Sequence, residues 1–273
     1  MEIPQLDSGS RPHLTVHNGQ VHAAYFDASK NLKWTVYDGA HWSEPQPIYD
    51  NGTIACHSDW TPAIVSHQGR LHCFHVAGID LGHGAHTNVL KWNSMGADGT
   101  WSTTTQVNGP SSIAETPAPA VLDGRLYLAF PGVRDLSGIY RLFVIRHDGA
   151  SWSDDLYTRE WITPSAPAMT VRNNQLFLFV RAVDDKIHGT YSSDGTLWIP
   201  LTVRGEWDTA SAPALGVHDD RLYLAYRNKT DNTTRWSSMN NGAAWSATDS
   251  IPDTSRHALG LTEHYGQLHL LFW

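Results

Sequence analysis

The sequence is poor in charged residues, and most of them are acidic. They make up 17% of the chain, and the formal net charge is -8. A nucleic-acid-binding surface needs a basic patch or stripe, so this balance excludes nucleic acid as a partner. No run of about 18 apolar residues is present, so we expect no membrane span. Residues 1–10 lack a basic stretch followed by an apolar one. Because no signal peptide is visible, we expect a protein that is cytoplasmic or released without such a signal.

Cysteine is almost absent. Cys56 and Cys73 are the only two, which is too few for a disulfide framework or a zinc site. The 16 histidines are scattered, and the densest group (His72, His75, His83 and His86) has no spacing that would make its members converge on a metal. We therefore expect no metal and no cofactor.

A repeat accounts for most of the chain. Ser211–Ser246 opens with Ala-Pro-Ala-Leu, turns at Asp219-Asp220, alternates apolar and other residues in RLYLAYR, and ends with an Asn-Gly turn followed by Trp245. Alternation at period two, interrupted by Asx and Gly turns, indicates antiparallel strands joined by tight hairpins. The opening proline recurs at intervals of 46 to 55 residues, at Pro12, Pro62, Pro117, Pro167 and Pro213.

Repeats of 40 to 55 residues with four strands each are typical of a β-propeller, in which each repeat is one blade. We predict a single all-β propeller domain, residues 1–273, built from four-stranded antiparallel blades. The expected number is six blades, the last assembled from both termini, with five or seven as alternatives. The repeats fall at residues 10–58, 59–115, 116–163, 164–209, 210–255, and 256–273 together with 1–9.

We name the four strands of each repeat A to D. Turns A–B and C–D are short and alike, and each C–D turn has a glycine followed by a tryptophan. Loops B–C and D–A lie on the opposite face and vary in length, so function is expected there. The longer loops are Asp27–Asn31, Ala77–Asn88, Pro131–Gly138, Asp184–Lys186 and Asn228–Thr233 (B–C), and Asp50–Asp59 and Arg159–Ser165 (D–A).

Strand C carries the first candidate binding residues. A cation precedes an indole in three repeats, and an indole can stack on the apolar face of a sugar while the cation donates to hydroxyls. The alternative is that the tryptophans pack between blades and the cations extend into solvent. The residues are Lys33 with Trp34, Lys91 with Trp92, Arg235 with Trp236, and Arg141, which is followed by Leu142; the fifth repeat has His188-Gly189 there.

The D–A loops and the ends of strand B supply the other candidates. A carboxylate beside an indole in an exposed loop can accept from two sugar hydroxyls. These pairs are Glu160-Trp161, Glu206-Trp207 and Asp59-Trp60, and strand B ends in Arg181 and Arg227. An aspartate also recurs just after strand B, and such residues more often form Asx turns than bind ligands. They are Asp27, Asp80, Asp135, Asp185 and Asp231.

The repeat pattern P-A-L-x-V-x-x-G-x-L-Y-L-A-Y-R…D-G-x-x-W-S resembles bacterial and fungal β-propeller lectins of the tectonin and fucolectin type. Ser238–Trp245 also resembles the Asp-box, a structural hairpin of sialidase-type propellers. The lectin resemblance implies several equivalent shallow sugar sites between blades and no metal.

We therefore predict a multivalent carbohydrate-binding lectin rather than an enzyme, because a catalytic site is built once and the unusual polar residues here recur. The alternatives are a scaffold for protein–protein interaction and, third, a glycoside hydrolase. The expected partners are glycans on glycoproteins or glycolipids. A homodimer is possible through Gln267–Trp273, an apolar strand short of charge that would be free to pair.

Overall fold

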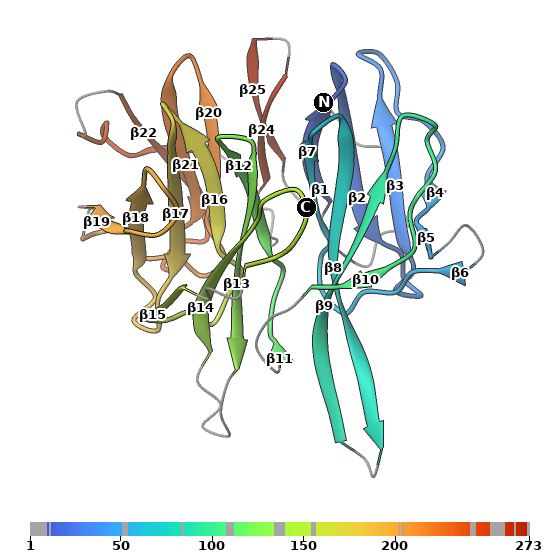
Figure 1. Cartoon of the computed structure of the whole chain (residues 1–273). Coiled ribbons are helices and arrows are strands. Elements are labelled where there is room, and N and C mark those ends of the chain that lie inside the picture. The colour runs from blue at the N-terminus through green and yellow to red at the C-terminus, as the bar shows by residue number, and fades with distance from the viewer. Residues whose placement is uncertain are drawn as a thin grey trace. The chain divides into compact units, whose positions relative to one another are not determined.

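The computed structural model describes residues 10, 12–50, 54–82, 85–107, 112–133, 140–153, 157–201, 203, 205–240, 244–251, 260–264 and 266–271. The chain forms two compact units, Met1–Pro117 with Gly132–Gly138, and Ala118–Pro131 with Ile139–Trp273. In these ranges all regular structure is β-strand (Figure 1). No helix within them is long and apolar enough to cross a membrane.

The first unit contains two four-stranded antiparallel sheets. Blade 1 consists of β1 (His13–His17), β2 (Gln20–Phe26), β3 (Leu32–Tyr37) and β4 (Gln46–Pro47). Blade 2 consists of β7 (Ala63–His67), β8 (Arg70–Gly82), β9 (Ala85–Met95) and β10 (Thr105–Gln106). The small strands β5 (Tyr49–Asp50) and β6 (Ile54–Ala55) pair with each other, and β11 (Ser112–Ile113) pairs with Gly132 and Val133 of the same unit.

The second unit contains three further blades of the same order. Blade 3 consists of β12 (Ala118–Leu122), β13 (Arg125–Val133), β14 (Arg141–His147) and β15 (Tyr157–Ile162). Blade 4 consists of β16 (Ala168–Arg172), β17 (Gln175–Arg181), β18 (Ile187–Ser192) and β19 (Ile199–Leu201). Blade 5 consists of β20 (Ala214–His218), β21 (Arg221–Arg227), β22 (Thr234–Met239) and β23 (Asp249–Ile251).

The fold class predicted from the repeats is confirmed, because the chain is an all-β propeller of four-stranded antiparallel blades. Five such blades are seen in the described residues, which is the number given as an alternative to six. The last repeat forms a two-stranded sheet, β24 (Gly260–His264) with β25 (Gln267–Leu271), in the described part of the chain. The expected contribution of residues 1–9 to that repeat lies outside the described residues.

The turns follow the chemistry read from the sequence. Each A–B turn is closed by two residues with positive φ, such as Asn18 (51°) with Gly19 (76°) and Asp219 (47°) with Asp220 (55°). That conformation fits the twist of a two-residue hairpin, and Asn, Asp and Gly adopt it at little cost. In the C–D turn of blade 4, Asp194 Oδ1 accepts from the backbone N–H groups of Thr196 (2.7 Å) and Leu197 (2.9 Å).

One expected loop is mostly strand. Ala77–Asn88 was expected to be a B–C loop, but β8 and β9 continue through it as a paired ribbon in which Ala77 lies opposite Val89 and Asp80 opposite His86. Figure 1 shows both strands extending well past their neighbours in blade 2. The expectation of a loop is wrong because antiparallel pairing satisfies the backbone polar groups of this segment.

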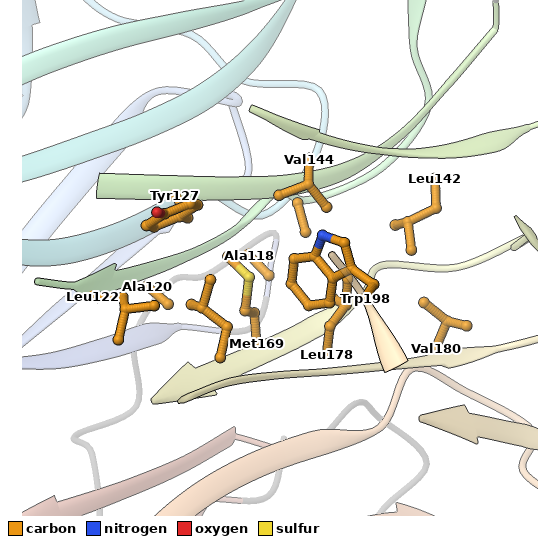
Figure 2. Packing of buried hydrophobic residues seen from close by; sticks show 12 residues of the cluster. Ala118, Ala120, Leu122, Tyr127, Leu142, Val144, Met169, Leu178, Val180 and Trp198 are labelled. Atoms are coloured by element: carbon orange, nitrogen blue, oxygen red, sulfur yellow. The ribbon is translucent and has the colours of Figure 1, made fainter. Parts of the chain in front are cut away.

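Apolar side chains of neighbouring blades form the cores. Between blades 3 and 4, the buried Trp198 packs among side chains of both sheets, including Val144, Met169 and Leu178 (Figure 2). Blades 4 and 5 share a second core, and blades 1 and 2 share another that contains the buried thiols of Cys56 and Cys73. Each core therefore needs two adjacent blades, as the repeat pattern implies.

In blades 1, 4 and 5, a large residue of one strand lies opposite a small residue of the other between strands B and C. Trp34 lies opposite Ala24, and Trp236 lies opposite Ala225. In blade 4 the sizes are reversed, since Gly189 lies opposite Phe179. A Cβ atom on Gly189 would lie 2.7 Å from the Phe179 ring. The glycine is therefore required by packing in this blade.

Candidate functional site

The B–C loops of blades 1, 4 and 5 are hydrogen-bonded turns that each contain one residue with a left-handed backbone. The turns are closed by backbone hydrogen bonds from Asp27 to Asn31, Ala182 to Lys186 and Asn228 to Thr233, each of 2.9 Å. The residue before the end of each turn has a left-handed φ: Lys30 at 63°, Asp185 at 63° and Asn232 at 57°. Of these three loops, only that of blade 4 places a carboxylate at this position.

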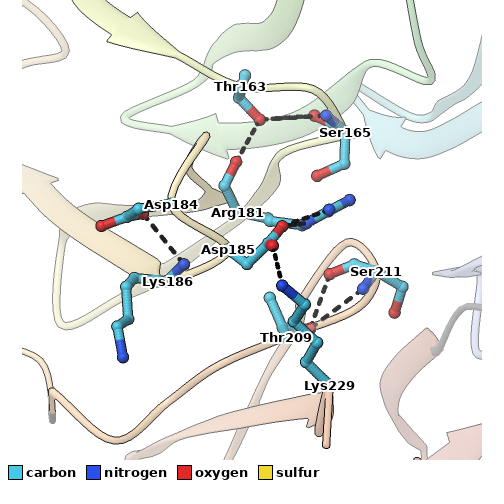
Figure 3. A network of polar contacts seen from close by, with 9 residues as sticks. All are labelled: Thr163, Ser165, Arg181, Asp184, Asp185, Lys186, Thr209, Ser211 and Lys229. Atoms are coloured by element: carbon cyan, nitrogen blue, oxygen red, sulfur yellow. Dashed lines mark hydrogen bonds and ion pairs between the residues drawn. The ribbon is translucent and has the colours of Figure 1, made fainter.

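Two cations hold the Asp185 carboxylate (Figure 3). Arg181 Nε donates to Oδ1 at 2.8 Å, and the Nη2 atom of the same guanidinium also contacts Oδ1. Lys229 Nζ lies 2.5 Å from Oδ2. The pKa of Asp185 is lowered, first by the hydrogen bond from Lys229 and then by that from Arg181. Asp185 is therefore an ionised carboxylate at neutral pH.

A second ion pair lies next to it. Lys186 Nζ lies 2.5 Å from Asp208 Oδ1 in the D–A loop and donates to the Gly205 carbonyl at 2.9 Å. The D–A segment is anchored by Thr209, whose buried hydroxyl donates to the Ser211 carbonyl at 2.9 Å. We call Arg181, Asp185, Lys186, Asp208 and Lys229 the blade 4–5 network. It joins loops of two adjacent blades within the second unit.

The corresponding corner of the first unit, where the B–C loop of blade 1 meets the D–A loop before blade 2, has different charges. There Lys30 Nζ donates to Asp59 Oδ1 at 2.7 Å, and the Gly78 N–H donates to Asp59 Oδ2 at 3.0 Å. The pKa of Asp59 is lowered, mainly by the hydrogen bond from Lys30. Lys33 Nζ lies 3.8 Å from Asp27 Oδ2. The carboxylate in this corner is thus held by one cation and one backbone N–H.

The loop tryptophans do not form the exposed platform that was expected. Trp207 is fully buried in the core shared by blades 4 and 5, and its indole N–H donates to Thr248 Oγ1 at 3.0 Å. The expectation that this indole is exposed in a loop is wrong, because the Ile187 N–H donates to the Trp207 carbonyl and draws the residue against blade 4. Glu206 is exposed beside it, and Trp60 is half-buried.

Glu160 and Trp161 lie in a strand and not in a loop. Both belong to β15 (Tyr157–Ile162), at a bulge where the partners of Arg141 and Leu142 are Ile162 and Arg159. Their side chains are not among those the structure describes.

The strand C tryptophans are half-buried in aromatic stacks. The Trp34 ring is stacked on His22 with centroids 5.8 Å apart. Trp92 Nε1 donates to His72 Nδ1 at 3.0 Å, and the centroids of Trp236 and Tyr223 lie 6.0 Å apart. These contacts agree with the packing alternative.

The basic candidates have mixed surroundings. Arg235 is half-buried and pairs with Asp231 at 2.6 Å, whereas Arg227 is buried with Nε 3.3 Å from Asn232 Oδ1. Lys91, within β9 of blade 2, and Arg141, the first residue of β14 in blade 3, are half-buried. Of the candidates, Arg181, Glu206, Trp207, Arg227, Arg235 and Trp236 belong to blades 4 and 5 and the loop between them, and the others belong to blades 1 to 3.

Two of the recurring loop aspartates, Asp27 and Asp231, form turns as interpreted from the sequence, whereas Asp80 lies in strand β8 and Asp135 lies outside the described residues. Asp27 Oδ1 accepts from the N–H groups of Ser29 and Asn31, and Asp231 Oδ1 accepts from Thr233. In blade 4 the turn is formed by Asp184, whose Oδ1 accepts from the Lys186 N–H at 3.1 Å. Asp185 is the second residue of an Asp-Asp pair, and its side chain is left for the cations. That doublet is the sequence signal that could have identified it.

Among the described residues, no group of three or more His, Cys, Asp or Glu side chains could hold a metal ion. His75, from the densest histidine group, is buried, and burial lowers its pKa to about 3.

The sequence matches the family described as BNR repeat-like domain over residues 31–215, more than half of the chain. The chain belongs to the BNR repeat-like domain family. A search of curated proteins found no match.

Similar solved structures include sugar-binding and sugar-cleaving proteins. The sialidase of Trypanosoma rangeli is 12% identical with a TM-score of 0.64 over 97% of this chain and 52% of its own, so this chain spans about half of it. An α-L-arabinofuranosidase from Lactobacillus brevis is 15% identical with a TM-score of 0.54, covering 82% and 85%. The Aleuria aurantia lectin, solved with a fucoside disaccharide, is 12% identical with a TM-score of 0.67, covering 96% and 87%. At these identities the likeness shows the fold.

These findings correct the predicted function. The family that the sequence matches is the BNR repeat-like domain family, and sialidases and a glycosidase are among the similar structures. The leading interpretation as a lectin, and the prediction that the protein is not an enzyme, are therefore overturned. The argument from symmetry was also incomplete, because the loops repeat in backbone but not in side chain: Asp185 occurs where blades 1 and 5 have Lys30 and Asn232.

Proposed function

We propose that this BNR repeat-like propeller is a glycoside hydrolase whose site is the blade 4–5 network. The single observation that carries the proposal is Asp185, an ionised carboxylate held by two cations in a loop whose counterparts in blades 1 and 5 carry no carboxylate at that position. A catalytic site is built once, so it is expected where the repeat is broken. Cleavage of a glycosidic bond generally uses two carboxyl groups flanking the bond.

The residues can be assigned roles on this basis. Asp185, with its lowered pKa, is suited to be the charged partner, which activates water or attacks the anomeric carbon. The second carboxyl group donates a proton to the leaving oxygen, and Glu206 and Asp208 in the facing D–A loop are the candidates. Water completes the reaction by adding to the anomeric carbon, so a sugar and an alcohol are released.

The substrates are glycans, in agreement with the sugars in the names of the similar structures. Glycoproteins and glycolipids are the natural sources of such linkages. Val183 is strongly exposed beside Asp184 in the B–C loop of blade 4 and offers an apolar contact for a sugar ring.

The proposal is tested by incubating the protein with a panel of 4-methylumbelliferyl glycosides, both acidic and neutral, and measuring released fluorophore. We expect at least one glycoside to be cleaved well above the rate in buffer. Asp219→Asn makes the same chemical change as Asp185→Asn, but in an exposed A–B turn. It is the matched control and should leave the rate unchanged. No cleavage of any glycoside or natural glycan by folded protein would contradict the proposal.

The second carboxyl group is identified by Glu206→Gln and Asp208→Asn. The variant that removes the proton donor should lose most activity on glycosides with poor leaving groups and retain more on activated aryl glycosides, which need less proton donation. If both variants keep full activity on both kinds of substrate, the acid lies elsewhere and the assignment is wrong.

The homodimer remains a prediction. Among the described strands, β25 pairs only with β24, which leaves one edge for a second copy. Light scattering on the wild type and on Leu271→Lys tests it: a dimer that dissociates with the charge supports pairing, and a wild-type monomer contradicts it.

A further inference from the structure

The Asp185 carboxylate is held from two different blades. Arg181, four residues earlier at the end of β17, contacts Oδ1. Lys229 belongs to the B–C loop of blade 5 and reaches across to Oδ2 at 2.5 Å. Its backbone N–H also donates to the Asp208 carbonyl at 3.2 Å, so the D–A loop fixes the point from which the side chain extends.

The position of Lys229 differs in blade 2. The N–H of Ala210 donates to the Arg227 carbonyl, as that of Asp59 does to the Val76 carbonyl, so Gly78 is the counterpart of Lys229. Gly78 has no side chain and contacts its carboxylate through the backbone. Of these two blades, blade 5 therefore supplies a cation to the carboxylate of the preceding loop, and blade 2 does not.

We infer that Lys229 is a positioning residue that fixes the Asp185 carboxylate from the adjacent blade and thereby sets the lowest pH at which the site works. This role rests on the proposed function as far as activity is concerned, but the control of Asp185 by Lys229 does not. Lys229 is the more exposed of the two cations, with a side-chain exposure of 56% against 25% for Arg181. It is therefore the partner that can be removed with the least change in packing.

Other charged groups face the same carboxylate or its neighbours. Lys186 is occupied by Asp208, and Asp184 lies 3.7 Å from His188 Nε2. Loss of a nearby cation destabilises the charged form of a carboxyl group, so its pKa rises. Removing Lys229 should therefore raise the pKa of Asp185, whereas removing Lys186 should act mainly on Asp208.

The test is a carbon-detected NMR titration of the Asp185 side-chain carboxyl in the wild type, Lys229→Met, Lys229→Arg and Lys186→Met. We expect Lys229→Met to raise the pKa of Asp185 by about one unit, Lys229→Arg to restore it, and Lys186→Met to leave it nearly unchanged. On a cleavable glycoside, the acidic limb of the kcat/KM profile should move upward with the pKa of Asp185 in Lys229→Met.

The outcomes separate the two proposals. If no glycoside is cleaved but the titration shows the expected shift, the proposed function fails and the control by Lys229 stands. If Asp185 titrates in Lys229→Met as it does in the wild type, with the fold confirmed by backbone spectra, Lys229 has no such role. An equal shift of the Asp185 pKa in Lys186→Met would also overturn the inference. The shift would then come from the loss of any nearby positive charge and not from the contact with Lys229.

Discussion

The B–C loop of blade 1 in the first unit and that of blade 4 in the second have the same backbone and opposite charges. Lys30 and Asp185 both have φ of 63° at the same point of a turn. Lys30 pairs with one aspartate, whereas Asp185 is held by two cations. The difference shows that the repeat specifies where a side chain is placed, and that the residue type at one position then decides which charge the loop presents.

The largest change in the free energy of unfolding is expected at the position where the side chains of the two D–A loops differ most in volume. Trp207 and Cys56 are counterparts, since their carbonyls accept from Ile187 and Leu32 at the start of strand C. Trp207→Ala should lower the free energy of unfolding by about 3–5 kcal/mol, because a buried indole leaves a large cavity. Cys56→Ala should cost only about 1 kcal/mol. Urea unfolding of both variants checks this, and a mild effect of Trp207→Ala would mean that the indole is not core.

The next effect concerns the exchange of large and small residues between strands B and C. Gly189→Ala should destabilise the protein by about 1–3 kcal/mol, because the new methyl group meets the Phe179 ring. The double variant Gly189→Trp with Phe179→Ala copies the Trp34–Ala24 pair of blade 1 and should be more stable than Gly189→Trp alone. Thermal unfolding measures both, and an additive double variant would contradict the compensation.

Buried histidines of the first unit should make the folding stability of the protein fall at acid pH. The pKa of His22 is lowered to about 4, first by burial and then by the charge of His17. Between pH 6.5 and 4 the unfolded chain binds a proton at His22 and the folded chain does not, so stability is lost as the pH falls through this window. His22→Gln should remove about 2 kcal/mol of the stability difference between pH 7 and pH 4.5. An unchanged pH dependence in urea unfolding would contradict this.

The smallest effect is expected for the surface ion pair of blade 1. Lys30→Met removes a contact of 2.7 Å to Asp59, but Lys30 is largely exposed. Such pairs contribute about 0–1 kcal/mol, so the melting temperature should change little. A loss well above 1 kcal/mol would mean that the corner of the first unit depends on its ion pair more than a surface pair allows.

The sequence predicts the blades well because each hairpin is specified locally. Asn18-Gly19 and Asp219-Asp220 form their turns with nearby residues only, and strand alternation does the rest. The burial of Trp207 could not be read in this way, because it depends on the bridge between its loop and the start of β18. Nor could the place of Glu160 and Trp161 at a bulge of β15, because the pairing of that strand depends on β14.

The candidate site was only partly predictable for the same reason. Arg181 and Glu206 were identified from their places in the repeat, but Lys229 and Asp208 were not, since their role arises only where loops from different blades meet. Asp185 was noted and interpreted as a turn former. That interpretation fits Asp184 instead, which accepts the turn N–H of Lys186.

The most direct test of the account compares the two loops in one assay. Initial rates of hydrolysis of the best glycoside from the panel are measured for the wild type, Asp185→Asn and Asp27→Asn, which makes the same chemical change in the B–C loop of blade 1. We expect Asp185→Asn to reduce kcat by at least about a thousandfold, which is the loss typical of a catalytic carboxylate. Asp27→Asn should retain the wild-type rate, because asparagine can still accept from the turn N–H groups. A wild-type rate in Asp185→Asn, or an equal loss in both variants, would contradict the account.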